Sequence, residues 1–169
     1  MSNSHDGARN EFSGTIKVIG IGQSLRGDDA AGLAAVHLWQ ERYQENKERP
    51  YLQVELAELP GIGLLSLLEG AGMVILVDAV RCGADAGTIH ILSREQLEAF
   101  PNEAGSAHGW GVAETISLGE KVMPANMPEK IILIGIEGVD FSMGKPLSPE
   151  VGLALPEVAR LIEQLATRE

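Results

Sequence analysis

The sequence predicts a three-layer α/β/α sandwich with about five strands, in which a mostly parallel, twisted sheet has one antiparallel edge strand. Two observations predict this fold class. Short apolar runs alternate along the chain with amphipathic segments of helical length, as they do in parallel α/β sheets. In addition, one connection between two strands is too short to hold a crossover helix, which predicts that one edge strand runs antiparallel.

The length and composition of the chain are those of a single globular domain. Its 169 residues, 44% of them hydrophobic, suffice for a core of ordinary size. We expect residues 1–14 to form a flexible polar tail and residues 15–169 to form one folded domain. Cys82 is the single cysteine, so an internal disulfide and a multi-cysteine metal site are excluded. We interpret it as an inert thiol in a reducing compartment.

Charge and hydropathy narrow the expected partners and location. The formal net charge of -11 opposes binding to nucleic acid or to an anionic membrane, because both favour clusters of Lys and Arg. The polar N-terminal stretch has no apolar core of signal-peptide type, and no later apolar run approaches the roughly 18 residues of a membrane span. We therefore expect a cytoplasmic protein with no nucleic-acid partner and no membrane insertion.

The expected elements alternate between strand and helix. The strands of the parallel part of the sheet are predicted at residues 16–21, 54–57, 73–77 and 130–136. Met73–Val77 is apolar at every position, which indicates a strand buried on both faces of the sheet. The helices are predicted at residues 28–45, 60–70, 95–100, 109–122 and 149–166.

One connection departs from this alternation. The central strand is expected to end at Asp78, and only about nine residues separate it from a strand predicted over Thr88–Leu92, whereas a helical crossover needs about a dozen or more. This connection therefore predicts an antiparallel hairpin. The strand at 88–92 is then the antiparallel edge of the sheet.

A glycine-rich turn, Gly20–Asp29, joins the first strand to the first helix. Its glycines are typical of turns that approach a phosphate, but Leu25 replaces the third glycine of the dinucleotide-binding fingerprint. Asp28 and Asp29 also stand where the helix N-terminus would meet the pyrophosphate, and their carboxylates would repel it. The turn therefore indicates either a cation site or a helix cap.

Polar side chains that follow neighbouring parallel strands meet at the carboxyl edge of the sheet. Asp29 follows the first predicted strand and Asp78 the third, and a strand order that begins 2-1-3 makes these strands neighbours. His108 precedes a later helix, and the chain before it is long enough to return to the same edge. Two carboxylates and one imidazole would form an oxygen and nitrogen site for Zn²⁺, Ni²⁺ or another divalent ion with open positions.

Structural roles account for the same residues without a metal. Asp28 and Asp29 are common capping residues, and Asp78 after a buried strand can accept hydrogen bonds from turn amides. An isolated histidine is more often a surface or core residue than a ligand. We assign structural roles to His37, inside the first helix, and to His90, in the edge strand. The residue pattern by itself leaves the metal site and these structural roles open.

Several segments together resemble the hydrogenase maturation endopeptidases, which remove a C-terminal extension from the large-subunit precursor of nickel–iron hydrogenases. The resemblance spans roughly residues 16–165. The matching segments are Gly20–Asp29, Val77–Val80, Ala86–Ile89, Ser106–Gly111, Leu133–Glu137 and Leu147–Pro149. Each segment is weakly specific alone, whereas their order and spacing together are specific.

The resemblance implies the ligands of the site and its role. The metal-binding positions of the family fall on Asp29, Asp78 and His108, which would act in catalysis through the bound metal, while Asp28 caps the helix. The implied ion is nickel that the precursor already carries, with Zn²⁺ or Cd²⁺ as substitutes in vitro. The implied partner is this precursor, and hydrogenase assembly chaperones are further candidates. Such a protease cuts only after nickel has been inserted.

The chain departs from the family pattern after the second strand. The family often has Asp-Gly-Gly-Thr where this chain has Glu58, Leu59, Pro60 and Gly61. Glu58 keeps the acid, and the proline stiffens the loop; we expect Glu58, Pro60 and Gly61 to contact substrate. A non-enzymatic nickel-binding chaperone module of hydrogenase assembly is the alternative function, and it would use the same three ligands.

Overall fold

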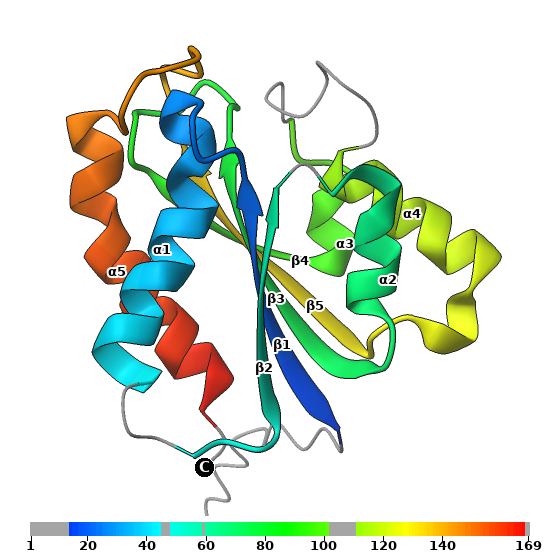
Figure 1. The fold of residues 1–169 in the computed structure, drawn as a ribbon. Helices are drawn as coiled ribbons and strands as arrows, with labels where there is room; N and C mark the ends of the chain where they lie inside the picture. The colour runs from blue at the N-terminus through cyan, green and yellow to red at the C-terminus, as the bar shows by residue number, and fades with distance from the viewer. Residues whose placement is uncertain (1–13, 45–47, 59, 102–110, 168–169) are drawn as a thin grey trace, which may run out of the picture.

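A five-stranded sheet in the order β2-β1-β3-β5-β4 forms the centre of the protein (Figure 1). The computed structural model of the protein describes residues 14–44, 48–58, 60–101 and 111–167. The strands are β1 (Thr15–Gly22), β2 (Leu52–Glu58), β3 (Ala71–Val80), β4 (Ile89–Ser93) and β5 (Lys130–Glu137). The first three and β5 run parallel, and β4 runs antiparallel to β5. The predicted mostly parallel sheet with one antiparallel edge strand is confirmed.

Helices cover both faces of the sheet, which confirms the three-layer sandwich (Figure 1). On one face lie α1 (Ala31–Trp39) and α5 (Pro149–Ala166). On the other face lie α2 (Leu64–Leu68), α3 (Arg94–Leu97) and α4 (Val112–Val122). Shorter helical turns are the 3-10 turns η1 (Gly27–Ala30), η3 (Gly61–Gly63) and η4 (Pro124–Asn126) and the π-helical turn η2 (Gln40–Gln44).

The two faces of the sheet carry separate hydrophobic cores, and β3 contributes to both. Ile75 and Val77 belong to the core under α1 and α5, whereas Val74 and Leu76 belong to the core under α2 and α4. All four side chains are fully buried. A strand buried on both faces has no polar side to expose, which is why its sequence is continuously apolar.

The connection after β3 differs from the predicted hairpin. β4 runs antiparallel as expected, but it pairs with β5 and not with β3. The nearly fully buried β5 pairs in parallel with β3 and takes the central position, where its apolar side chains are covered on both faces. The partly exposed β4 lies at the edge, because the connection at 81–88 is long enough to cross one intervening strand, a distance of about 10 Å.

The ends of two elements also differ from the prediction. β3 continues to Val80, so Asp78 lies inside the strand, opposite Gly135 of β5, and not after it. The predicted end was wrong because a carboxylate interrupts the apolar run without ending the backbone pairing. The predicted first helix begins as the 3-10 turn η1 and becomes α-helical at Ala31. The predicted polar tail lies almost wholly outside the described residues.

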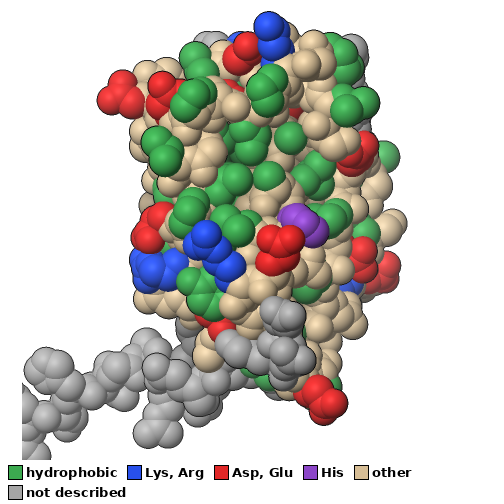
Figure 2. All heavy atoms as spheres, turned by 60° about the vertical axis from the view of Figure 1, so that its left-hand side comes forward, with side chains coloured by type: hydrophobic (Ala, Val, Ile, Leu, Met, Phe, Trp, Pro, Cys, Tyr) green, Lys and Arg blue, Asp and Glu red, His purple; other side chains and the backbone are tan. Residues whose placement is uncertain are grey.

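The outer face that carries α1 and α5 has hydrophobic side chains over its middle, with acidic and basic side chains around them (Figure 2). His37 of α1 is exposed there, and its Nε2 lies 3.2 Å from a carboxylate oxygen of Glu41, which fits the structural role predicted for this histidine. None of the described helices combines the length and the apolar character that crossing a bilayer requires.

Gly32 allows α1 to approach the sheet closely. A Cβ at this position would lie 2.1 Å from the carbonyl oxygen of Val77 and 2.4 Å from that of Ile21. We expect Gly32→Ala to lower the free energy of unfolding by about 3 kcal/mol, because the backbone of β1 or β3 would have to move. Urea denaturation measures this difference.

Gly152→Ala in α5 is the matched control, since nothing lies within 4 Å of a Cβ placed at Gly152. This substitution should leave the free energy of unfolding unchanged or raise it by up to about 1 kcal/mol, as Ala favours helix over Gly. Equal effects of the two substitutions would contradict the close packing of α1 on the sheet.

Candidate functional site

Two of the three predicted ligands, Asp29 and Asp78, come together at the carboxyl edge of the sheet. Asp29 lies in η1, the first element after β1, and Asp78 lies near the end of β3, which is the neighbour of β1. Burial raises the pKa of Asp78 well above its ordinary value, and the nearby negative charge of Asp29 raises it further. The two carboxylates are therefore close enough to repel each other.

The third predicted ligand, His108, lies outside the described residues. The described chain resumes at Gly111, which precedes the first residue of α4. His108 therefore stays a predicted ligand.

The electrostatics of the aspartate pair fit a cation. Burial raises the pKa of Asp29, and the positive charge of Arg26 acts in the opposite direction. Burial and like charge both disfavour the ionised forms of such a pair, and a divalent cation between the carboxylates would offset both effects. Two carboxylate oxygens are donors that a divalent ion with open coordination positions accepts.

The glycine turn places Asp29 by folding back on itself. The N–H of Gln23 donates to the carbonyl oxygen of Asp29 at 3.3 Å, and the N–H of Asp29 donates to the carbonyl oxygen of Arg26 at 3.1 Å. Gly22 has a φ of 154°, and a Cβ there would lie 1.9 Å from the carbonyl oxygen of Asp29. Only glycine allows the chain that carries Asp29 to pass this close to the end of β1.

Asp28 does not cap the helix, contrary to the prediction. Its side chain is fully buried, and it forms no capping hydrogen bond in η1 or α1. Its Oδ2 accepts the N–H groups of Val139 (2.8 Å) and Asp140 (3.0 Å), and its Oδ1 accepts the N–H of Ser148 at 2.7 Å. The Ser148 hydroxyl donates to the same carboxylate. The partners of Asp28 are thus remote in sequence, and its neighbours in the chain do not indicate them.

The segment 138–148, between β5 and α5, is bound to the glycine turn by further hydrogen bonds. Four of them connect backbone or side-chain donors of one segment to carbonyl oxygens of the other: Asp28 N–H to Asp140, Gly27 N–H to Lys145, Gly144 N–H to Leu25, and Arg26 Nε to Phe141. These bonds hold the segment 138–148 and the turn that carries Asp29 together as one unit.

The three predicted substrate-binding residues lie at the carboxyl end of β2. Glu58 is exposed, and its Oε1 accepts the backbone N–H of Ser24 at 3.1 Å. Hydrogen bonds with Ser24 lower the pKa of Glu58. Pro60 precedes η3, and Gly61, the first residue of η3, has a φ of 49°. Glu58 therefore supports the glycine turn from the side of β2, at the same edge of the sheet as the aspartates.

Comparison with known proteins identifies the family. A family model described as hydrogenase maturation protease matches residues 35–165. The chain belongs to the hydrogenase maturation protease family. It is therefore a protease, a hydrolase of peptide bonds, as the sequence predicts.

Two relatives show how far the similarity extends. The hydrogenase expression/formation protein HupD of Bradyrhizobium diazoefficiens is 29% identical over 138 residues, which cover 80% of this protease and 69% of the relative. The hydrogenase 2 maturation protease of Escherichia coli is 28% identical over 149 residues, which cover 88% of this protease and 84% of the relative.

Solved structures share the fold of the protease. The hydrogenase maturating endopeptidase HybD from Escherichia coli has a TM-score of 0.76 at 24% identity, over 89% of this chain and 91% of that chain. A nickel–iron hydrogenase maturation protease HybD from Thermococcus kodakarensis has a TM-score of 0.68 at 22% identity, over 90% of this chain and 99% of that chain. The α/β sandwich is thus common to these proteins.

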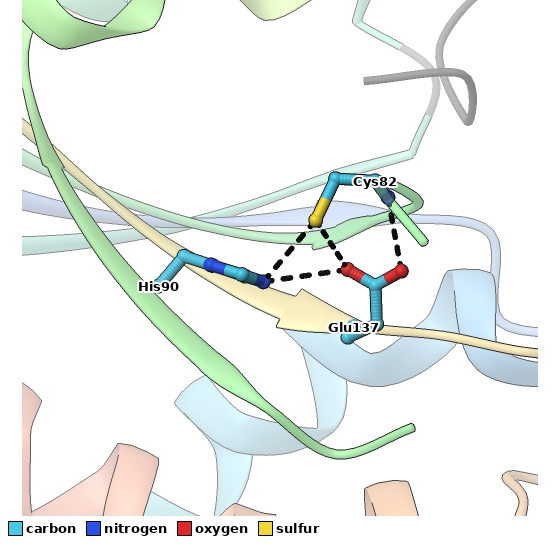
Figure 3. Close-up of side chains that lie close together, drawn as sticks. All are labelled: Cys82, His90 and Glu137. Carbon is cyan, nitrogen blue, oxygen red and sulfur yellow. Dashed lines mark hydrogen bonds and ion pairs between the residues drawn. The ribbon is translucent and has the colours of Figure 1, made fainter. Parts of the chain in front are cut away.

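The protease contains a second polar cluster that the sequence does not reveal, made of Cys82, His90 and Glu137 (Figure 3). Cys82 follows β3, His90 lies in β4, and Glu137 ends β5. The Sγ of Cys82 and the Nε2 of His90 lie 3.1 Å and 3.3 Å from the Oε2 of Glu137. The predicted β3–β4 hairpin does not indicate this cluster. The cluster forms because β5, which carries Glu137, lies between β3 and β4. The one signal in the sequence is Glu137, a charged residue that directly follows the apolar run 131–136.

Glu137 is the buried centre of this cluster. Its exposed fraction is 1%, and its Oε1 accepts the backbone N–H groups of Cys82 (2.9 Å) and Gly83 (3.0 Å). Burial alone would raise the pKa of Glu137, but hydrogen bonds from Cys82, Gly83 and His90 outweigh it, and the pKa is lowered. Burial, together with the hydrogen bond to Glu137, raises the pKa of the Cys82 thiol.

Replacement of the buried Asp28 carboxylate tests how the turn is anchored. We expect Asp28→Asn to lower the free energy of unfolding by about 2–4 kcal/mol at neutral pH, because the amide group cannot accept all the N–H donors of the segment 138–148. Burial raises the pKa of Asp28, but hydrogen bonds from Asp140, Val139 and Ser148 outweigh it, so the folded-state pKa is lowered. The stabilisation by Asp28 is therefore present above the unfolded-state pKa of about 3.9 and is lost as the pH falls through the folded-state value.

Urea denaturation of the wild type and the Asp28→Asn variant over a pH series measures this effect. The difference in the free energy of unfolding should be largest near neutral pH and should shrink in acid. Asp140→Asn is the control with the same change of charge, because the exposed Asp140 carboxylate accepts a hydrogen bond from its neighbour Ser142 and does not accept the buried N–H groups that bind Asp28. A difference for Asp28→Asn that does not depend on pH would contradict the anchoring role of the carboxylate.

Proposed function

We propose that this protease is an endopeptidase that removes a C-terminal extension from the large-subunit precursor of a nickel–iron hydrogenase after nickel has been inserted. Membership of the hydrogenase maturation protease family supports this function. The observation that carries it is the meeting of Asp29 and Asp78 at the carboxyl edge of the sheet, where α/β proteins bind their ligands. The substrate in this function is the precursor together with its nickel.

Asp29, Asp78 and His108 are the proposed ligands to the nickel that the precursor carries. The repulsion between Asp29 and Asp78 favours binding of a divalent cation. Asp29 also lies at the N-terminal side of α1, where the helix dipole opposes a cation, so the affinity for free metal is modest. Weak binding of free metal suits a site that engages nickel only when the precursor presents it with ligands of its own.

The proposed chemistry takes place at the nickel in the substrate. A metal ion beside a peptide bond polarises the carbonyl group or activates a water molecule. The sequence has no His-Glu-x-x-His motif that would supply a separate zinc site with a general base. The three ligands of this chain would orient the nickel toward the scissile bond, so that cleavage depends on nickel insertion.

Contacts with the polypeptide of the precursor are proposed for Glu58, Pro60 and Gly61. Glu58 lies beside the turn that carries Asp29, because it accepts the N–H of Ser24, and Pro60 and Gly61 follow β2 at the same end of the strand. The neighbouring side chains of Leu25 and Ile62 are large, hydrophobic and exposed, which suits contact with an extended peptide. Assembly chaperones as partners and a cytoplasmic location stay predictions from the sequence.

Mass spectrometry of a purified precursor tests the proposed function. We expect the protein to release a C-terminal peptide from the nickel-loaded precursor and to leave the nickel-free precursor uncut. Asp78→Ala and His108→Ala should each lower the cleavage rate by about 100-fold or more, the usual scale for loss of a group that stabilises charge at the reacting centre. Asp140→Asn, which changes a carboxylate outside the proposed ligands, should retain the rate of the wild type.

The outcomes separate the parts of the proposal. A nickel-loaded precursor that stays uncut with the wild type would overturn the endopeptidase function and favour the nickel-binding chaperone module. Cleavage at the wild-type rate by both ligand variants would overturn the assignment of the site.

A further inference from the structure

We propose that Cys82, His90 and Glu137 form a second metal site, which binds a thiophilic divalent cation, Zn²⁺ before others, through one thiolate, one imidazole nitrogen and one carboxylate oxygen. The three donor atoms lie within 4.8 Å of one another (Figure 3). They are the Sγ of Cys82, the Nε2 of His90 and the Oε2 of Glu137. The site uses none of the residues proposed to bind the nickel of the precursor.

Two of the three distances between the donor atoms lie within about 0.1 Å of those around tetrahedral zinc. With Zn–S of about 2.3 Å and Zn–N and Zn–O of about 2.0 Å, sulfur lies about 3.5 Å from nitrogen or oxygen ligands, and nitrogen and oxygen ligands lie about 3.3 Å apart. The corresponding distances in the cluster are 3.6 Å and 3.3 Å. The Sγ–Oε2 distance is 3.1 Å, the length of a thiol–carboxylate hydrogen bond. It would lengthen to about 3.5 Å when a cation replaces the thiol proton.

The surroundings hold each ligand in place before a cation binds. The Oε1 of Glu137 accepts the backbone N–H groups of Cys82 and Gly83, so Oε2 is left to face the thiol and the imidazole. The rings of His90 and Phe100 pack edge to face, with 5.1 Å between the ring centroids. Hydrogen bonds and packing of this kind orient the ligands of metal sites and raise their affinity.

A nucleophilic cysteine triad does not explain the cluster. In such a triad the thiol meets one ring nitrogen of the histidine and the carboxylate meets the other. Here Cys82 and Glu137 both approach Nε2 of His90. Three donors that converge on one point are the arrangement of metal ligands, and a thiolate with an imidazole selects Zn²⁺ over hard cations such as Mg²⁺.

The proposed site lies at the carboxyl edge of the sheet, where a metal ion can exchange with solvent. His90 and Asp78 are both paired with Gly135 of β5, from opposite sides, so two strand spacings of about 10 Å separate their backbones. Among the described residues no fourth Cys, His, Asp or Glu joins the group, which leaves one coordination position for water or an external ligand. The side chain of His90 is 18% exposed, so an ion can enter from solvent.

Optical titration of the metal-free full chain with Co²⁺ tests this proposal. Tetrahedral Co²⁺ absorbs in the visible range, and a thiolate ligand adds a charge-transfer band in the near ultraviolet. Cys82 is the single cysteine, so a thiolate band can come from no other residue. We expect one equivalent of Co²⁺ to give both absorptions and Zn²⁺ to displace it.

Variants distinguish a site with three ligands from binding of Co²⁺ by the Cys82 thiolate alone. Cys82→Ser should abolish the thiolate band, and His90→Gln should weaken Co²⁺ binding at least about 10-fold. Asp78→Asn should leave the band unchanged, because Asp78 belongs to the other proposed site. Circular dichroism of each variant verifies that it is folded.

The proposal would be overturned by a wild type that gives no thiolate band. It would equally be overturned if His90→Gln bound Co²⁺ as tightly as the wild type, because Cys82 would then act alone. Loss of the band in folded Asp78→Asn would show that the thiol and the aspartate serve one site, which also contradicts a second site. None of these results depends on cleavage of a precursor, so the proposed function is tested separately.

Discussion

The buried carboxylate of Asp28 is the interaction on which the carboxyl edge of the sheet depends. It accepts the N–H groups of Val139, Asp140 and Ser148, residues 111 to 120 positions away in the chain. These bonds attach the turn after β1 to the segment after β5. Because Asp29 belongs to this turn, they also fix its backbone position. The two adjacent acids therefore have different surroundings: Asp28 is buried and accepts backbone N–H groups, while the charge of Asp29 acts on Asp78. Because a buried carboxylate is stable only when its partners are in place, the turn and the segment 138–148 order each other.

Much of the fold could be predicted from the sequence, because burial leaves a direct pattern in it. The continuous apolar run of β3 predicts a strand in the middle of the sandwich. The amphipathic spacing of α5 predicts a helix that covers one face of the sheet. The partner of β4 could not be predicted in this way. A short connection predicts that the next strand runs antiparallel, but it does not predict which strand becomes its partner. The strand that separates β4 from β3 is β5, which comes about 40 residues later in the chain. The predicted end of β3 at Asp78 is wrong because this carboxylate interrupts the apolar run inside a strand that continues to Val80.

The candidate site was predictable where it follows from sheet topology alone. Asp29 follows β1 and Asp78 lies in β3, the parallel neighbour of β1, so the predicted order 2-1-3 places both at the same edge of the sheet. The cluster of Cys82, His90 and Glu137 depends instead on the order β3-β5-β4, because its members lie in the connection after β3, in β4 and at the end of β5. Asp28 was misassigned for a related reason, since a helix cap is a local interaction and its true partners are remote. Apart from Glu137, which ends an apolar run, the residues of these long-range contacts are not indicated by their neighbours in sequence.

The central claim is that Asp29, Asp78 and His108 form one metal-binding unit at the carboxyl edge. Anomalous scattering from crystals of the protein soaked with Cd²⁺ tests it most directly, because the signal locates the ion without reference to activity. We expect a cadmium peak within coordination distance of a carboxylate oxygen of Asp29, a carboxylate oxygen of Asp78 and a ring nitrogen of His108. Cadmium found only at other residues, with no peak between Asp29 and Asp78, would contradict the claim.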